Sequence, residues 1–195
     1  MSIKKIVIVG PESTGKTTLC RQLAAHYHSL YCPEYAREYL LTHGKSYEYD
    51  DLLTIAKAQL QQEDTCIQQL LGISANRTAA KSIHPYLFID TDMYVMKVWC
   101  EFVFDQCHKW ILDQITERRY DLYLLCKPDL PWVKDELREY PDLERRLKLY
   151  HYYKDLLVHQ ATPWAEISGN YEERLQQAIA ATDALYRGRM AEQEM

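Results

Sequence analysis

The order of hydrophobic patterns along the chain predicts a single α/β domain with a doubly wound parallel sheet. Short runs of β-branched and aromatic residues alternate with longer stretches of helical spacing, the pattern of strands joined by crossover helices. The first run ends in a glycine-containing turn that opens a helical stretch. The 195 residues contain no repeat, linker or second apolar core. We therefore expect one domain over residues 1–188 and a flexible polar tail over 189–195.

The first half of the chain predicts a central strand, a short second strand and three helices. The first strand is an almost unbroken β-branched run, as expected for a strand that is buried on both faces. The longest helix begins after an N-cap at Asp50 or Asp51 and ends at Gly72. We place the strands at 4–10 and 30–33 and the helices at 16–28, 34–42 and 52–71.

The second half continues the alternation after a turn-like segment at residues 76–85. An apolar run that ends in Asp90 predicts the third strand, with its carboxylate at the carboxyl edge of the sheet. Residues 127–163 are opened by prolines and then densely charged and aromatic, which we interpret as an inserted helical lid. We place strands at 86–90, 122–126 and, more weakly, 165–168, and helices at 91–104, 109–119 and 172–187.

Composition excludes several classes of protein. The formal charge of −5 disfavours a protein whose main task is to bind duplex nucleic acid. No apolar run approaches the length of a membrane span, and none has the form of a signal peptide. The six cysteines form no C-x-x-C pair or disulfide framework, so we expect reduced thiols. A cytoplasmic protein with a small-molecule substrate, and neither a membrane nor a nucleic-acid partner, is the expectation.

The turn after the first strand carries the strongest functional signal. Residues 10–17 read G-P-E-S-T-G-K-T and match G-x-x-x-x-G-K-[ST] in full, between a predicted strand and a predicted helix. Such a loop points backbone N–H groups at an anion, and the helix start adds its positive dipole end. Lys16 then reaches the β- and γ-phosphates, and the Thr17 hydroxyl binds Mg²⁺. We assign ATP binding here to Gly10, Glu12, Ser13, Thr14, Gly15, Lys16, Thr17 and Thr18.

Two carboxylates follow the third predicted strand. Asp90 stands where nucleotide-binding proteins hold the acid that orients Mg²⁺, so we predict a metal role shared with Thr17. A carboxylate at a strand end also serves as a helix N-cap. For Asp92, substrate contact and capping are both open.

The identity of the phosphate acceptor decides between three classes of protein. A regulatory GTPase would carry an N-K-x-D motif, of which Lys127-Pro128-Asp129 is at best a broken form. A remodelling ATPase needs a helical lid domain and a neighbour's arginine finger, for which the chain leaves little room. A small-molecule kinase needs a cationic lid that excludes water. Arg138, Arg145 and Arg146 supply such cations, although a solvated charged helix is an equally open interpretation.

Several segments together carry a more specific pattern. They are the loop at 10–17, P-E-Y-A-R-E-Y at 33–39, F-I-D-T-D at 88–92 with Trp99 beyond it, D-L-P-W-V at 129–133 and S-G-N-Y-E-E-R at 168–174. In this combination the chain resembles the ribosylnicotinamide kinase domain of the NadR type over nearly its whole length. The resemblance implies a P-loop kinase fold with a five-stranded parallel sheet. It implies ATP-dependent phosphorylation of the 5′ hydroxyl of nicotinamide riboside to nicotinamide mononucleotide, in NAD salvage.

The chain departs from this family at two places. It lacks the H-x-G-H signature of the adenylyltransferase domain of multifunctional members, so it would be the kinase alone. Where D-G-L-R is expected, residues 135–138 read D-E-L-R, which alters the lid turn and makes the role of Arg138 less secure.

Nicotinamide riboside carries a pyridinium cation, which aromatic faces and carboxylates favour. Glu34, Asp92, Tyr35 and Trp99 supply such groups, and with Arg37 of the P-E-Y-A-R-E-Y segment they are the residues that we assign to substrate binding. Two plainer interpretations stay open: Trp99 as a core residue, and Glu34 with Arg37 as a helix ion pair. The loop around residues 169–171, with Asn170, would touch adenine.

The predicted mechanism is mostly positioning and electrostatics around Mg·ATP. Lys16 and Arg138 would neutralise the transferring phosphoryl group, and Glu34 or Asp90 would orient the acceptor hydroxyl. Two alternatives share the loop: a kinase for another nucleoside or nucleotide, and a regulatory P-loop ATPase that acts on a partner protein. The oligomeric state is left open.

Overall fold

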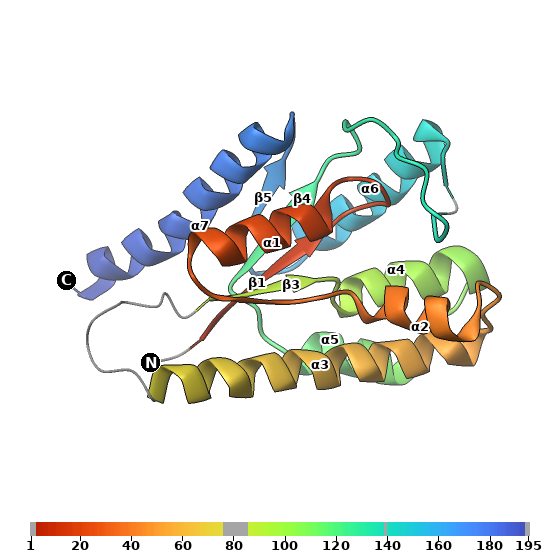
Figure 1. Ribbon diagram of the computed structural model, residues 1–195, viewed down its shortest axis with the longest axis horizontal. Coiled ribbons are helices and arrows are strands. Elements are labelled where there is room, and N and C mark those ends of the chain that lie inside the picture. Colours follow the sequence, from red (N-terminus) through yellow and green to blue (C-terminus); the bar gives the residue numbers. More distant parts are fainter. Residues whose placement is uncertain (1–2, 76–85, 139, 194–195) are drawn as a thin grey trace.

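The computed structural model describes residues 3–75, 86–138 and 140–193 and shows the predicted α/β architecture. Within these residues, five strands form one sheet and seven helices flank it (Figure 1). The turn-like segment predicted at 76–85 lies outside the described residues. Among the described residues, no helix combines the length and the hydropathy that crossing a membrane requires.

The sheet is parallel throughout and has the strand order β2-β3-β1-β4-β5. The strand β1 is central and pairs with β3 on one side and β4 on the other. Because chain order reverses at β1, the loops after β1 and β3 meet at one edge, where parallel sheets bind ligands. The strands are β1 (Lys4–Val9), β2 (Leu30–Cys32), β3 (Tyr86–Asp90), β4 (Leu122–Cys126) and β5 (Trp164–Ile167).

Helices cover both faces of the sheet, as Figure 1 shows. Alternate residues of β1 point into two different clusters: Ile6 and Ile8 pack with α1 and α7, and Val7 and Val9 pack with α3, α4 and α6. A third apolar cluster joins α2, α3, α4 and α5. The helices are α1 (Lys16–His26), α2 (Tyr35–His43), α3 (Tyr49–Ala75), α4 (Met93–Phe104), α5 (Lys109–Glu117), α6 (Leu143–Val158) and α7 (Tyr171–Gln193).

Two helix ends differ from the prediction. Helix α3 continues through Gly72 to Ala75, because one helical glycine costs only about 1 kcal/mol and no proline follows directly. Helix α7 continues over residues 189–193, where a tail was expected. The residues there include Met190, Ala191 and Glu192, which favour helix, so composition alone does not end it.

The region predicted as a helical lid, 127–163, has two parts with different structures. Helix α6 packs on the sheet through Leu149, Tyr150, Tyr153 and Leu157, so it is a core helix rather than part of a flap. The part that crosses the glycine-containing loop is irregular. We call residues 127–138 and 140–142 the strap.

Candidate active site

The loop between β1 and α1 has the backbone conformation that its glycines allow. Gly10 has φ +141°, and a Cβ atom there would lie 2.6 Å from the carbonyl oxygen of Cys126 on β4. Gly15 has φ +77°, and a Cβ there would lie 3.0 Å from a methyl group of Leu130 in the strap. Both positions need glycine, since L side chains rarely adopt such angles. The loop is therefore pressed against its neighbours, and helix α1 begins directly after it.

Side chains of the loop bond back onto its own backbone. The Lys16 Nζ and the buried Thr14 hydroxyl both donate to the Pro11 carbonyl, at 2.8 Å each. Lys16, the first residue of α1, therefore directs its ammonium group back onto the loop. Unpaired N–H groups at a helix start, together with an ammonium group, form an anion site.

The neighbouring strand places a buried carboxylate beside the loop. The Thr17 hydroxyl donates to Asp90 Oδ2 at 2.5 Å, and Asp90 Oδ1 is buried with no hydrogen-bond partner. Burial, and next the charge of Glu34, raise the pKa of Asp90 to about 6. A buried carboxylate with an unpaired oxygen beside a hydroxyl fits Mg²⁺, which takes one or two protein oxygens and completes its shell with phosphate and water. Among the described residues, no group of three or more acidic, His or Cys side chains could hold a metal alone.

Arg174 on α7 fastens the loop from behind, a contact that the sequence interpretation did not assign. It is 2% exposed and donates to the backbone carbonyls of Thr14 (3.1 Å), Lys127 (3.0 Å) and Gly169 (2.7 Å). It also pairs with Asp129, which accepts a hydrogen bond from the Gly169 N–H at 2.7 Å. The S-G-N-Y-E-E-R segment ends in this residue. The fold shows that Arg174 joins the loop, through Thr14, to the segments that follow β4 and β5, through Lys127 and Gly169.

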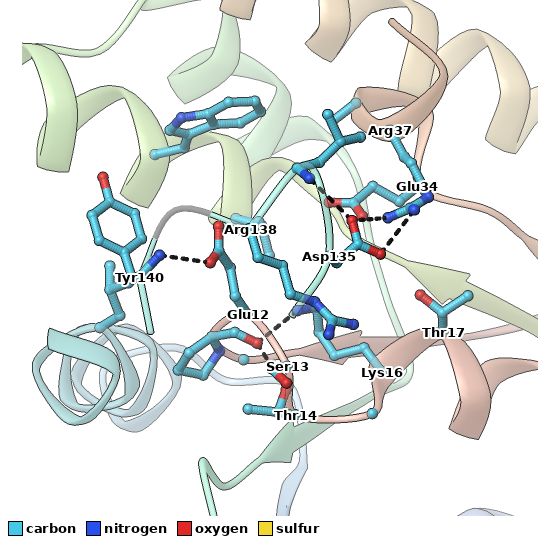
Figure 2. A pocket seen from close by; sticks show the side chains of 18 of the residues that line it. Glu12, Ser13, Thr14, Lys16, Thr17, Glu34, Arg37, Asp135, Arg138 and Tyr140 are labelled. Atoms are coloured by element: carbon cyan, nitrogen blue, oxygen red, sulfur yellow. Dashed lines mark hydrogen bonds and ion pairs between the residues drawn. The ribbon is translucent and has the colours of Figure 1, made fainter. Parts of the chain in front are cut away.

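The strap crosses the loop and is tied to its rim by side chains. The Val133 N–H donates to Ser13 Oγ (3.1 Å), and the Tyr140 N–H donates to Glu12 Oε2 (3.1 Å). Figure 2 shows the Tyr140 contact on one side of the cavity and a second tie, between strap and α2, on the other. Glu12 and Ser13, assigned above to ATP binding, therefore also hold the strap.

The strap and the loop enclose a cavity of about 520 Å³, a size that suits small molecules. One half is the loop with its helix start. The other half lies under the strap and between α2, α4 and α6, where Val95, Val98 and Phe102 supply an apolar floor. Of the predicted site residues, the cavity is lined by Gly10, Glu12, Ser13, Thr14, Gly15, Lys16, Thr17, Thr18, Glu34, Arg37, Trp99 and Arg138.

The second half presents a carboxylate and an aromatic side chain to the same space. Glu34 stands at the start of α2, makes no capping hydrogen bond there and accepts from the Thr91 hydroxyl at 3.5 Å. Thr91 has φ +82°, an outlier for a β-branched residue, and such strain concentrates at functional sites. Trp99 is anchored by its indole N–H, which donates to the Tyr47 hydroxyl at 2.9 Å.

Four predicted site residues lie outside this lining: Asp90, whose contact with Thr17 is described above, and Asp92, Asn170 and Tyr35. Asp92 is 1% exposed and caps α4 by accepting from two backbone N–H groups, while its second oxygen accepts from Tyr123 at 2.8 Å. Burial raises its pKa to about 7. Asn170 caps α7, and its neighbour Tyr171 lines the cavity instead. Tyr35 packs in the α2–α5 cluster. For Asp92, the geometry favours the capping alternative over substrate contact.

The three arginines considered for the lid have different environments. Arg138 lines the cavity and donates to the Val133 carbonyl. Arg145 is exposed and stacks on Tyr140. Arg146 is 4% exposed, lies 5.3 Å from the ring centroid of Trp132 and has two nitrogens without a hydrogen-bond partner. Arg138 precedes α6, whereas Arg145 and Arg146 lie on it, so Arg138 shares no helical face with either.

Comparison with known proteins gives the same assignment of the fold. The chain is 31% identical over 140 residues to the trifunctional NAD biosynthesis/regulator protein NadR of Salmonella typhimurium and of Escherichia coli. The match covers 70% of this chain and 31% of each relative, so the chain spans about a third of their length. It also resembles crystal structures of NadR in complex with NAD and AMP-PNP (TM-score 0.63) and in complex with NR (TM-score 0.65). Both structures are 22% identical and cover 94% of this chain and 49% of theirs.

The profile of the AAA domain family matches residues 5–174, from β1 to the start of α7. This range contains the loop, the strap and Arg174. Together with the NadR homology it supports a nucleotide-binding P-loop domain. The chain is similar to one part of NadR, and it belongs to the AAA domain family of P-loop proteins.

Proposed function

We propose that the protein transfers the γ-phosphoryl group of ATP to the 5′ hydroxyl of nicotinamide riboside. The observation that carries this proposal is that one cavity joins the phosphate-binding loop to a chamber with a carboxylate, Glu34, and an aromatic face, Trp99. A phosphate donor and a separate acceptor therefore have adjoining places. A regulatory ATPase needs only the first.

The loop half would bind and polarise the nucleotide. Backbone N–H groups of the loop and Lys16 would hold the β- and γ-phosphates. Thr17 and Asp90 would hold Mg²⁺, which when bound neutralises charge on the phosphates. Lys16 would exchange its bond to the Pro11 carbonyl for phosphate oxygens. Arg138 stands closest to a catalytic role among the three arginines, because it alone lines the cavity.

The chamber half would orient the acceptor. Glu34 would accept a hydrogen bond from the attacking hydroxyl and hold that hydroxyl in line with the phosphorus. This role depends on the position of the carboxylate more than on its basicity. The pyridinium ring of nicotinamide riboside would lie on apolar and aromatic surface near Trp99, with the negative charge of Glu34 close by. The structures of NadR with NR and with AMP-PNP support this pairing of ligands.

A substrate panel with product identification tests the proposal. The protein is incubated with Mg·ATP and nicotinamide riboside, with common ribo- and deoxynucleosides, or with nucleoside monophosphates, and ³¹P NMR identifies the products. The proposal predicts nicotinamide mononucleotide as the fastest-formed product. Faster phosphorylation of another nucleoside would reassign the substrate, and slow hydrolysis with no phosphorylated acceptor would favour the regulatory ATPase.

A further inference from the structure

We propose that Asp135 of the strap determines specificity by occupying Arg37, so that the acceptor chamber prefers an unphosphorylated nucleoside and holds a nucleoside 5′-monophosphate weakly. The inference rests on the proposed function, since it concerns the acceptor of that same site. Asp135 acts here as a positioning residue, through the guanidinium group that it holds.

The pair is bidentate and joins two walls of the cavity. Arg37 Nη2 lies 2.9 Å from Asp135 Oδ2, and Nη1 lies 3.2 Å from Asp135 Oδ1. Figure 2 shows the two groups facing each other close to Glu34, with Thr17 and Lys16 below them in this view. Both residues line the cavity.

Arg37 is the cation that a phosphate on the acceptor would meet first. It lies one helical turn after Glu34, the residue proposed to face the acceptor hydroxyl. Of the other cations that line the cavity, Lys16 and Arg138 are assigned above to the phosphates of the nucleotide, and Arg21 donates to the Tyr31 hydroxyl. Guanidinium binds phosphate and carboxylate through the same planar pair of N–H donors.

Asp135 is held in a position and in a charge state that let it compete with a phosphate for the Arg37 guanidinium. Its Oδ1 also accepts from the Leu137 N–H at 3.0 Å, which fixes the carboxylate within the strap turn. The hydrogen bonds from Arg37 and from Leu137 lower the pKa of Asp135, so it stays ionised near neutral pH. A product phosphate must displace this intramolecular anion, whereas a nucleoside need not. The chamber therefore binds the substrate without retaining the product as strongly.

Binding measurements separate this role from a merely structural one. Isothermal titration of the full chain, with Mg·ADP filling the loop, compares nicotinamide riboside with nicotinamide mononucleotide, and adenosine with AMP. The proteins are the wild type, Asp135→Asn, Arg37→Gln, the double variant and Glu136→Gln. Glu136 is an exposed neighbour whose charge acts on Arg37 without a hydrogen bond, so it controls for charge alone.

The expected result is a change in the ratio of the two affinities. Asp135→Asn should tighten monophosphate binding about fivefold relative to the matching nucleoside, the size expected for a partly exposed pair whose side chains are 48% and 21% exposed. The double variant should abolish this gain, and Glu136→Gln should leave the ratio unchanged.

An unchanged ratio in Asp135→Asn, an equal gain in Glu136→Gln, or no measurable monophosphate binding in any variant would overturn the inference. The adenosine pair keeps it separate from the proposed function. If Asp135→Asn changes the affinity ratio only for adenosine and AMP, the role of Asp135 is supported and nicotinamide riboside is rejected as the substrate.

Discussion

The two halves of the cavity are built in opposite ways. The loop half consists of consecutive residues between a central strand and a helix, and it is clamped by the buried Arg174. The chamber half is assembled from α2, α4, α6 and the strap, which are distant in sequence, and its ties are a few half-exposed contacts such as Arg37–Asp135. The half proposed to bind the nucleotide is thus held by buried contacts, and we call it the rigid half. The half proposed to select the acceptor is held by half-exposed contacts.

This difference predicts large effects in the loop half and smaller ones in the strap. The largest is expected for Lys16→Ala, which removes the ammonium group from the phosphate site. Turnover should fall about 10²- to 10³-fold, by analogy with the loss of one preorganised donor. Lys134→Ala, an exposed lysine of the strap, is the matched control and should retain turnover. Full activity in a correctly folded Lys16→Ala protein would show that phosphate binds elsewhere.

Asp90→Asn tests whether the neighbouring strand contributes a metal-binding carboxylate. The change keeps an oxygen that accepts from Thr17 but removes the charge, so turnover at saturating ATP should fall by up to about 10²-fold. Wild-type activity should also decline below about pH 6, where Asp90 takes up a proton. A variant with the same Mg²⁺ dependence as the wild type would remove Asp90 from the metal site.

The same carboxylate should cost stability at neutral pH. Burial raises the pKa of Asp90 to about 6, so the folded state binds the proton more tightly than the unfolded state does. Stability is therefore favoured below about pH 4 and lost as the pH rises to about 6, by up to about 3 kcal/mol. Urea denaturation should show Asp90→Asn gaining on the wild type over that pH range, with a constant difference above it. A difference independent of pH would contradict this origin.

Arg174→Met tests the clamp behind the loop. Removal of a buried guanidinium leaves three carbonyls and Asp129 without their donor, which should lower the free energy of unfolding by about 3 kcal/mol. Arg145→Met, which changes an exposed arginine, should cost less than about 0.5 kcal/mol. If denaturant titrations show the same loss of unfolding free energy in the two variants, the contacts of Arg174 do not stabilise the fold more than those of an exposed arginine.

The smallest effect is expected at the contact between strap and loop. Ser13→Ala removes the acceptor of the Val133 N–H, an exposed hydrogen bond worth about 1 kcal/mol or less. The KM for ATP should change less than about threefold, as steady-state kinetics would measure. A loss of activity in Ser13→Ala as large as that in Lys16→Ala would mean that the strap belongs to the rigid half. The proposed difference between the two halves would then be wrong.

The sequence predicted the loop half nearly completely, because its geometry is local. Residues 10–17 set the backbone angles and the helix start, and the apolar run that ends at Asp90 placed the acid at the adjoining edge. For the chamber half, the sequence predicted some of the lining residues but not how they pair. Glu34, Arg37 and Trp99 line the cavity. The pairing of Arg37 with Asp135 depends on residues 98 positions apart, which no local pattern specifies.

Buried polar side chains were the hardest to assign. For Asp92 the sequence left substrate contact and capping open, and for Arg174 it indicated no role. Both side chains bond to the backbone and to neighbouring side chains. The prediction of a helical lid failed for a related reason. The charge of α6 suggested a solvated helix, but its inward face carries the leucines and tyrosines that cover the sheet.

The proposed transfer reaction is tested most directly by the rate of ADP formation from Mg·ATP with and without nicotinamide riboside, measured in parallel for the wild type and Glu34→Gln. We expect the acceptor to stimulate the wild type strongly. For Glu34→Gln we expect the stimulated rate to fall about 10²-fold, with ATP binding unchanged. Tight ATP binding with no stimulation by the acceptor would contradict the proposal that the loop half and the chamber half together form one site for phosphoryl transfer.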